Sequence, residues 1–160
     1  MNENFRIRFA QDSDCALILE FIRELADYEN MSDDVVATTD GLRETIFEKK
    51  QAEVIIGEEN GVPVAFALFF HNYSTFLGRA GIYLEDLFVK KAHRGKGYGK
   101  SMLKKLASIA VERKCGRLEW SCLDWNQPSI DFYIKMGATP MDEWTVYRLT
   151  GESLLAAAAE

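Results

Sequence analysis

Residues 82–101 constrain the fold of this 160-residue chain more than any other segment. The apolar stretch 82–89 has the composition of a strand and carries two adjacent carboxylates, Glu85 and Asp86. A short basic loop with three glycines follows, and a strongly helical segment begins at about Tyr98. Glycines at a helix start let backbone N–H groups surround an anion, and the helix dipole adds roughly half a positive charge there. This order indicates an enzyme that holds a phosphorylated cofactor beside a cationic or protonated substrate.

The glycine loop has two nucleotide-type interpretations. Residues 99–101 read Gly-Lys-Ser like the end of a P-loop, but Arg94 stands where that motif requires its first glycine. The alternative is an Arg-x-x-Gly-x-Gly pattern, in which successive N–H groups bind a pyrophosphate and Arg94, Lys96 or Lys100 neutralises it. A glycine-rich connection with solvated lysines is the plain structural alternative, since glycine clusters alone are weak signals.

Composition places the chain among ordinary globular proteins, with 48% apolar and 28% charged residues. Its length suits a single domain, which we expect to extend over residues 1–160. The formal charge of −6 argues against nucleic-acid binding, which favours basic surfaces. No apolar run approaches the roughly 18 residues that would span a bilayer, so no membrane partner is expected.

Cysteine and histidine usage indicates the compartment and argues against a metal. Cys15, Cys115 and Cys122 are odd in number and have no C-x-x-C spacing. Structural zinc and a disulfide framework are therefore not expected, and a reducing compartment fits. His71 and His93 are isolated, so we expect no metal site. Since the N-terminal residues also lack the apolar core of a signal peptide, the sequence predicts a cytoplasmic protein.

Hydrophobic periodicity predicts alternating strands and helices. Asp12 or Ser13 is expected to cap the first helix, and the turn signal at 59–61 predicts a hairpin. The predicted strands are 5–9, 53–57, 62–70, 82–89, 117–122 and 144–149, and helices are predicted after Asp12 and at 40–49, 97–114 and 127–136. This order predicts an α/β fold with a mixed central sheet flanked by helices on both faces.

Several motifs, separated along the chain but in one order, resemble those of a known superfamily. They are Glu24-Leu-Ala-Asp-Tyr-Glu29, Tyr83-Leu-Glu-Asp-Leu-Phe-Val89, Arg94-Gly-Lys-Gly-Tyr-Gly99, Trp125-Asn-Gln-Pro-Ser-Ile-Asp-Phe-Tyr133 and Gly137-Ala138. Over nearly its whole length the chain resembles the GNAT superfamily of N-acetyltransferases, and within it the diamine (spermidine/spermine-type) and thialysine-preferring branch. The resemblance implies a single GNAT-type domain that transfers acetyl from acetyl-CoA, its cosubstrate, to a primary amine.

The resemblance also implies where acetyl-CoA binds. Backbone N–H groups around Leu87 and Val89 would hold the pantetheine and polarise the thioester carbonyl. Asn126 would contact the pantetheine, although a role as helix N-cap explains it equally well. The implied cofactor-binding residues are Leu87, Phe88, Val89, Arg94, Gly95, Lys96, Gly97, Tyr98, Gly99, Lys100, Asn126, Ser129 and Tyr133.

Two catalytic roles follow from the same resemblance. The family residue at Glu85 acts as a base through water, because an alkylamine with a pKa of about 10.4 is protonated at neutral pH and only its neutral form attacks a thioester. Strand alternation allows instead that Glu85 or Asp86 simply faces solvent. The family tyrosine at Tyr133 is the general acid for the departing thiolate, whereas an amphipathic core tyrosine is the structural alternative.

For the acceptor amine, the resemblance implies an acidic, aromatic pocket. The implied substrate-binding residues are Tyr28, Glu29, Glu85, Asp86, Asp142 and Glu143. Polyamine-specific relatives carry an acidic residue in the loop after the strand ending near residue 70, where this chain has Ser74. One fewer carboxylate favours thialysine, another lysine-like amino acid or a small diamine over a long polyamine.

Other assignments remain possible from the sequence. A non-catalytic acyl-CoA-binding domain would keep the glycine loop but need neither Glu85 nor Tyr133. A protein acetyltransferase acting on a lysine or an N-terminus would need an open peptide groove, whereas the aromatic and acidic loops predict a closed pocket for a small-molecule amine. Members of the resembling branch are homodimers, and the amphipathic stretch 144–149 is a candidate contact.

Overall fold

The computed structural model describes residues 4–159. Residues 1–3 and residue 160 lie outside the described residues. Residues 1–3 belong to the N-terminal stretch on which the prediction of a cytoplasmic protein was partly based. The chain divides into two compact units, Met1–Ser121 and Cys122–Glu160. The first contains a sheet with helices around it. In its described part, the second contains two helices and an extended segment between them.

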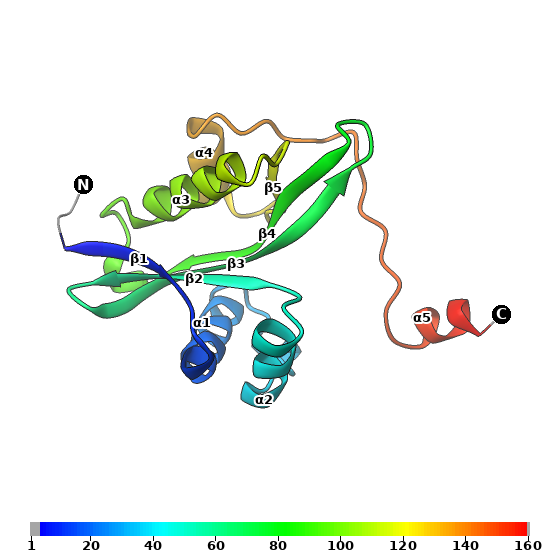
Figure 1. Ribbon diagram of the computed structural model, residues 1–160, viewed down its shortest axis with the longest axis horizontal. Coiled ribbons are helices and arrows are strands. Elements are labelled where there is room, and N and C mark those ends of the chain that lie inside the picture. Colours follow the sequence, from blue (N-terminus) through cyan, green and yellow to red (C-terminus); the bar gives the residue numbers. More distant parts are fainter. Residues whose placement is uncertain (1–3, 160) are drawn as a thin grey trace. The chain divides into compact units, whose positions relative to one another are not determined.

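A mixed sheet lies at the centre of the first unit (Figure 1). Within the described residues it has five strands, which follow one another across the sheet in chain order. Neighbouring strands pair antiparallel except for the last pair, which is parallel. The strands are β1 (Phe5–Phe9), β2 (Glu53–Glu59), β3 (Val62–Ser74), β4 (Arg79–Val89) and β5 (Leu118–Trp120).

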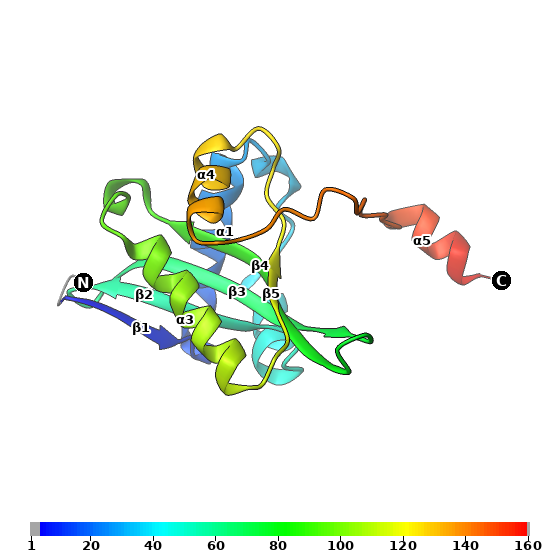
Figure 2. The same cartoon turned by 90° about the horizontal axis from the view of Figure 1, so that it is seen from above.

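Helices cover both faces of this sheet, which confirms the predicted α/β architecture. In Figures 1 and 2, α1 and α2 lie on one face and α3 on the other. The helices of the first unit are α1 (Cys15–Tyr28), α2 (Thr39–Leu42), its π-helical continuation η3 (Arg43–Glu48) and α3 (Tyr98–Glu112). Among the described residues, three short 3-10 segments precede α1, α2 and α3 in turn: η1 (Asp12–Asp14), η2 (Ser32–Asp34) and η4 (Lys91–His93).

Apolar side chains at helical spacing form the two cores. On the α1 face, Phe21 stacks on Phe66 of β3 with ring centroids 5.0 Å apart, and both are fully buried. From α3, Met102 and Leu106 are fully buried. Burying side chains of this size contributes about 1.5–3 kcal/mol each, so the amphipathic pattern accounts for how the helices dock.

The hairpin between β2 and β3 forms at the predicted turn. Asn60 and Gly61 both have positive φ, 52° and 80°, as a two-residue turn of this hand requires. The following loop, however, is shorter than predicted, because β3 continues to Ser74. Ser74 is buried, and its Oγ accepts a hydrogen bond from the Leu77 N–H at 3.2 Å. Ser74 therefore supports a tight turn between β3 and β4.

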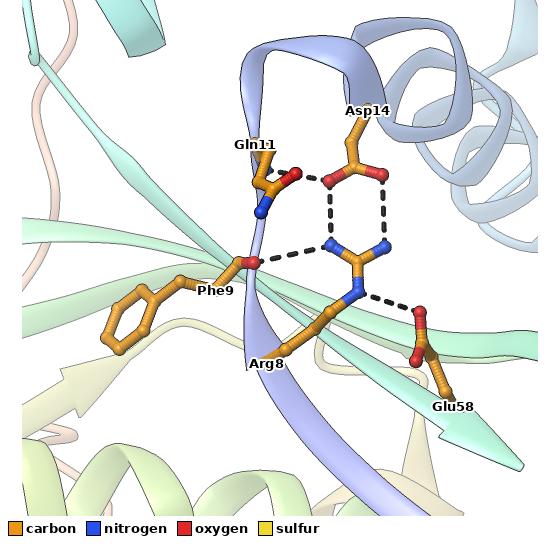
Figure 3. Close-up of polar contacts among 5 residues, drawn as sticks. All are labelled: Arg8, Phe9, Gln11, Asp14 and Glu58. Atoms are coloured by element: carbon orange, nitrogen blue, oxygen red, sulfur yellow. Dashed lines mark hydrogen bonds and ion pairs between the residues drawn. The ribbon is translucent and has the colours of Figure 1, made fainter. Parts of the chain in front are cut away.

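An arginine joins β1, β2 and the start of α1 (Figure 3). Arg8 donates to both carboxylate oxygens of Asp14, at 2.7 and 3.0 Å, and its Nε donates to Glu58 at 2.7 Å. Asp14 also accepts from the Gln11 N–H at 2.7 Å. The expected cap at Asp12 or Ser13 is therefore wrong: Asp14 occupies the N-cap position of α1, and its side chain binds Arg8 and Gln11 instead of capping the helix. Arg8 holds the pKa of Asp14 below its ordinary value.

In the second unit, the helix predicted at 127–136 is present as α4 (Gln127–Lys135). Its N-cap is Asn126, whose Oδ1 accepts a hydrogen bond from the Ser129 N–H at 3.4 Å. Pro128 lies in the first turn, where its missing N–H costs little. The capping role of Asn126 is confirmed. A second helix, α5 (Gly151–Ala158), was not expected.

The predicted strand at 144–149 is wrong. This segment is extended, but among the described residues no strand pairs with it, and every strand of the sheet belongs to the first unit. Its Trp144, Val146 and Tyr147 side chains are 76%, 77% and 92% exposed. Alternating apolar and polar residues predict which side chains would share one face of a strand, but they do not identify a pairing partner. A strand needs such a partner, because its backbone N–H and C=O groups pair with those of a neighbouring strand.

We predict that Asp14→Asn destabilises the protein by about 1 kcal/mol at pH 7, because it removes a charged partner of Arg8 at a partly exposed site. Since the folded-state pKa of Asp14 is lowered, this contribution is present above the ordinary aspartate pKa and is lost as pH falls. Urea unfolding at about pH 7 and pH 3 should show the deficit shrinking at the lower pH, and an equal deficit at both would contradict the assignment. Asp12→Asn, at an exposed pair with Arg43, is the matched control and should have little effect.

Candidate active site

A β-bulge places the two central carboxylates of β4. In the antiparallel register with β3, Asp86 lies opposite Leu68 and Leu84 lies opposite Phe69, which leaves Glu85 as the extra residue. A bulge interrupts the period of two that otherwise assigns strand side chains to faces. Glu85 is exposed and Asp86 is partly buried.

Three carboxylates gather around this bulge. Burial, then the charge of Glu85, then that of Glu29 raise the pKa of Asp86 to about 6. Glu29 follows the C-terminus of α1, and burial raises its pKa as well. Like charges in a partly desolvated place are unfavourable, and a bound cation would relieve both the repulsion and the desolvation. The structure thus brings together three of the predicted substrate-binding residues.

The glycine loop takes a backbone conformation that side chains disfavour. Gly95 and Gly97 have φ of 78° and 85°, and a Cβ added at either would meet no atom within 4 Å. The glycines are therefore required for conformation, and the space beside them is open. Gly97 is the N-cap of α3, so no side chain caps this helix. The first turn contains no acidic residue but does contain Lys100.

Such a helix start is suited to an anion. The N–H groups of a first helical turn have no acceptor within the helix, and the positive end of the dipole lies there. Basic residues at this end are unfavourable in isolation and become favourable when a negative group is bound. A diphosphate carries that charge, so the loop residues fit the cosubstrate that the sequence implied.

Arg94 joins the loop to the carboxylates. Its Nε donates to the Val89 carbonyl at 2.9 Å, and its guanidinium lies 4.6 Å from the ring centroid of Tyr28 and 5.2 Å from that of Phe88. Tyr28 precedes Glu29, so the predicted cofactor-binding and acceptor-binding residues of the first unit adjoin one another. Stacking on the rings also fixes the guanidinium plane.

The ladder between β4 and β5 ends early. It pairs Ile82 with Leu118 and, at its last position, Leu84 with Trp120. In the described part of the first unit, no strand pairs with that side of β4 from Glu85 to Val89. The stretch that contains Leu87 and Val89 therefore has a strand neighbour on one side, and an extended ligand is suited to the other.

The remaining predicted site residues belong to the second unit. On α4, Tyr133 is partly buried, packs against Phe132 with ring centroids 5.4 Å apart, and lies four residues after Ser129. Asp142 and Glu143 are exposed in a turn. The participation of these residues in one site with Glu85 stays a prediction.

Sequence reasoning missed one cluster. Glu59, at the end of β2, binds His93, Lys96 and Tyr98, although the sequence showed it only as part of a turn signal. The pairing depends on a strand and a loop nearly 40 residues apart, and no local pattern marks it. Within residues 4–159, no three metal-ligating side chains gather into a group that could hold a metal ion.

Comparison with known proteins identifies the family. The model of the acetyltransferase (GNAT) family matches residues 18–138. The chain is 39% identical over 160 residues to thialysine N-epsilon-acetyltransferase of Bos taurus, covering 92% of this chain and 94% of that protein. It is 32% identical to L-ornithine N5-acetyltransferase NATA1 of Arabidopsis thaliana, with 94% and 86% covered. An integron cassette protein from the mobile metagenome of V. cholerae has a similar structure, with a TM-score of 0.83, 28% identity, and 98% and 99% covered.

The chain therefore belongs to the GNAT acetyltransferase family and is an N-acetyltransferase. Within the family it falls in the branch of thialysine N-epsilon-acetyltransferases and spermidine/spermine N(1)-acetyltransferase-like proteins. The resemblance drawn from the separated motifs is confirmed. Across residues 4–159, every helix is too short or too polar to cross a membrane.

Because the folded-state pKa of Asp86 is raised to about 6, the folded protein should lose stability as pH rises from about 4 to 7, where this carboxyl must ionise in place. Asp86→Asn removes that loss. The free energy of unfolding of the variant, relative to that of the parent, should therefore be roughly 2 kcal/mol higher at pH 7 than at pH 4, given about 1.4 kcal/mol per pKa unit. Denaturant unfolding across this range measures it. A stability difference independent of pH would show that Asp86 ionises as an ordinary surface residue does.

Proposed function

We propose that this N-acetyltransferase transfers the acetyl group of acetyl-CoA to a primary amine of a small cationic substrate. The preferred acceptor is thialysine, another lysine-like amino acid or a small diamine, and long polyamines are poor substrates. The observation that carries the proposal is the juxtaposition, within the first unit, of the carboxylates Glu29, Glu85 and Asp86 with the glycine loop after Arg94. One group of residues suits a cationic amine and the other a diphosphate.

Acetyl-CoA supplies the activated acetyl group, and the chain supplies positions and charges. Main-chain N–H groups of the loop and of the first turn of α3 bind the diphosphate, and a basic side chain among Arg94, Lys96 and Lys100 neutralises it. The unpaired side of β4 holds the pantetheine, and N–H groups at Leu87 and Val89 polarise the carbonyl. Phe88, whose ring contacts Arg94, helps to fix the edge of this site.

Proton transfer divides between two residues. Glu85 accepts the proton of the ammonium group through a water, which produces the neutral amine that attacks. Its exposure at the bulge suits a base that works through solvent. Tyr133 donates to the departing thiolate, and Ser129 and Asn126, one turn and two turns before it, bind the cofactor. Donation from a phenol with a pKa near 10 to a thiol near 8.5 is uphill but serviceable in a concerted step.

The substrate preference rests on charge and on relatives. Two relatives are named for thialysine and L-ornithine, which are both α-amino acids with a distal amine. Ser74, which is buried at the end of β3, stands where the resemblance implies a carboxylate in polyamine-specific relatives, so a long polycation meets less negative charge. Tyr28 and Glu29 of the first unit, and Asp142 and Glu143 of the second, are the further proposed substrate-binding residues.

We also infer the organisation of this chain. Residues 1–160 act as one domain, because the family match runs across both units. The protein is a homodimer, as the resemblance to the diamine and thialysine acetyltransferase branch implies, and the apolar residues Trp144, Val146 and Leu149 are a candidate contact. A cytoplasmic location is consistent with the free cysteines Cys15, Cys115 and Cys122. A small-molecule amine, and neither a nucleic acid nor a membrane, is the proposed partner.

An amine panel with acetyl-CoA tests the substrate class. We expect kcat/KM for thialysine, lysine analogues or short diamines to exceed that for spermidine by at least about tenfold, because fewer carboxylates face a long polycation. A higher value for spermidine would overturn the preference. Turnover of lysine peptides above all free amines would indicate a protein acetyltransferase, and binding of coenzyme A without turnover of any amine would indicate a non-catalytic protein.

The two proton-transfer roles are separable by pH. Glu85→Gln should lower kcat on the order of a hundredfold near pH 7, and the deficit should shrink toward pH 10, where a much larger fraction of the amine is already neutral than at pH 7. Tyr133→Phe should lower kcat by a similar factor at every pH from 7 to 9, with little loss of acetyl-CoA affinity. A constant deficit for Glu85→Gln argues against base catalysis, and an unchanged kcat for Tyr133→Phe against the acid role.

A further inference from the structure

Glu59 binds three residues that surround the glycine loop. Its Oε1 accepts hydrogen bonds from Lys96 Nζ, at 2.9 Å, and from the Tyr98 hydroxyl, and its Oε2 accepts from His93 Nδ1 at 2.7 Å. The Glu59 side chain is only 14% exposed. The hydrogen bonds from Tyr98 and then Lys96 lower its pKa to about 2, so the carboxylate is ionised.

The three partners lie before, within and after the loop. His93 ends η4, Lys96 stands between Gly95 and Gly97, and Tyr98 is the first residue of α3. Glycine has more backbone freedom to lose than any other residue, so an unrestrained loop of this sequence would be mobile. Glu59 comes from a paired strand of the sheet and can therefore hold the loop against a fixed frame.

The helix end of this arrangement is itself anchored. Tyr98 is buried at 2% exposure, and its ring stacks on Phe5 of β1 with centroids 4.0 Å apart. Its hydroxyl reaches Glu59 at the end of the neighbouring strand. The carboxylate thus connects the loop to an apolar contact with the sheet, and its bonds to Lys96 and His93 extend that connection across the two glycines.

We propose that Glu59 is a positioning residue that holds the glycine loop in the conformation that receives the diphosphate of acetyl-CoA. The inference rests on the proposed function, which assigns the diphosphate to this loop. The inference also makes Glu59 the partner of the Lys96 side chain. Lys96 then contributes to diphosphate binding through its main-chain N–H and by helping to hold the loop in one conformation. Glu59 itself touches neither substrate and takes no part in the chemistry.

Coulomb attraction and positioning make opposite predictions for Glu59→Gln. A carboxylate beside an anion site repels the anion, so charge alone predicts that the variant binds coenzyme A more tightly. Loss of loop order predicts weaker binding, because the binding free energy must then also order the loop. Since Lys96 already offsets the charge of Glu59, we expect the loss of loop order to dominate.

Titration calorimetry with coenzyme A, together with steady-state kinetics of the 160-residue chain, provides the test. Glu59→Gln should raise the coenzyme A Kd and the acetyl-CoA KM about tenfold, while kcat at saturation and the KM of the amine change less than about twofold. Glu58→Gln is the matched control: it removes the next carboxylate along β2, which binds Arg8 at 2.7 Å, and should leave the coenzyme A Kd unchanged. Tighter or unchanged binding by Glu59→Gln would overturn the proposal.

A double-mutant cycle with Lys96→Met gives a second, independent arm. If Lys96 acts through Glu59, the double variant should bind coenzyme A no more weakly than Glu59→Gln alone. If Lys96 instead binds phosphate directly, the two losses multiply, and the proposal fails. Tyr98→Phe, which keeps the stacked ring and removes one donor, should also weaken binding severalfold, so an aggregated Glu59→Gln protein would not stop the test.

The same titration separates the two levels of inference. Binding of coenzyme A by the parent protein with no loss in Glu59→Gln overturns the positioning role alone. Absence of coenzyme A binding by the parent protein overturns the proposed function and, with it, the role of Glu59.

Discussion

Strand β4 changes its neighbours and its register at one point, and the candidate site is arranged around that change. From Ile82 to Leu84 the strand is paired on both sides, and from Glu85 onward, among the described residues, it is paired with β3 only. The same position carries the extra residue of the bulge, which releases Glu85 and Asp86 from the strict alternation of a strand. Backbone groups and two carboxylates thus become available together, a few residues before the glycine loop.

Opposite charges are kept on adjoining parts of the first unit. Glu29, Glu85 and Asp86 gather at the bulge, whereas the loop carries Arg94 and a helix end without acidic residues. Arg94 stacks on Tyr28 at the boundary between the two groups. Ionised Asp86 is unfavourable in the folded protein, because burial and the like charges of Glu85 and Glu29 raise its pKa. A protein that keeps such a residue gives up stability for a site suited to a cation.

The sequence correctly predicted those helices and turns that are determined by residues close together in the chain. Asn60-Gly61 marked the hairpin, Asn126 marked the start of α4, and apolar spacing marked α1 and α3. Features that depend on distant partners escaped prediction: the Arg8 contact that occupies Asp14, the pairing of Glu59 with the loop, and the bulge at Glu85. The stretch 144–149 failed for the same reason, because its alternation is compatible with a strand but cannot specify the neighbour that a strand needs.

We propose that main-chain amides of the glycine loop and the open side of β4 bind coenzyme A. Amide chemical shifts in a 15N-labelled protein titrated with coenzyme A test it most directly. We expect the largest changes at Gly95, Gly97 and Gly99 and at Leu87 and Val89, saturating with one binding constant. Changes that saturate elsewhere on the chain while these five amides stay unmoved would contradict the claim.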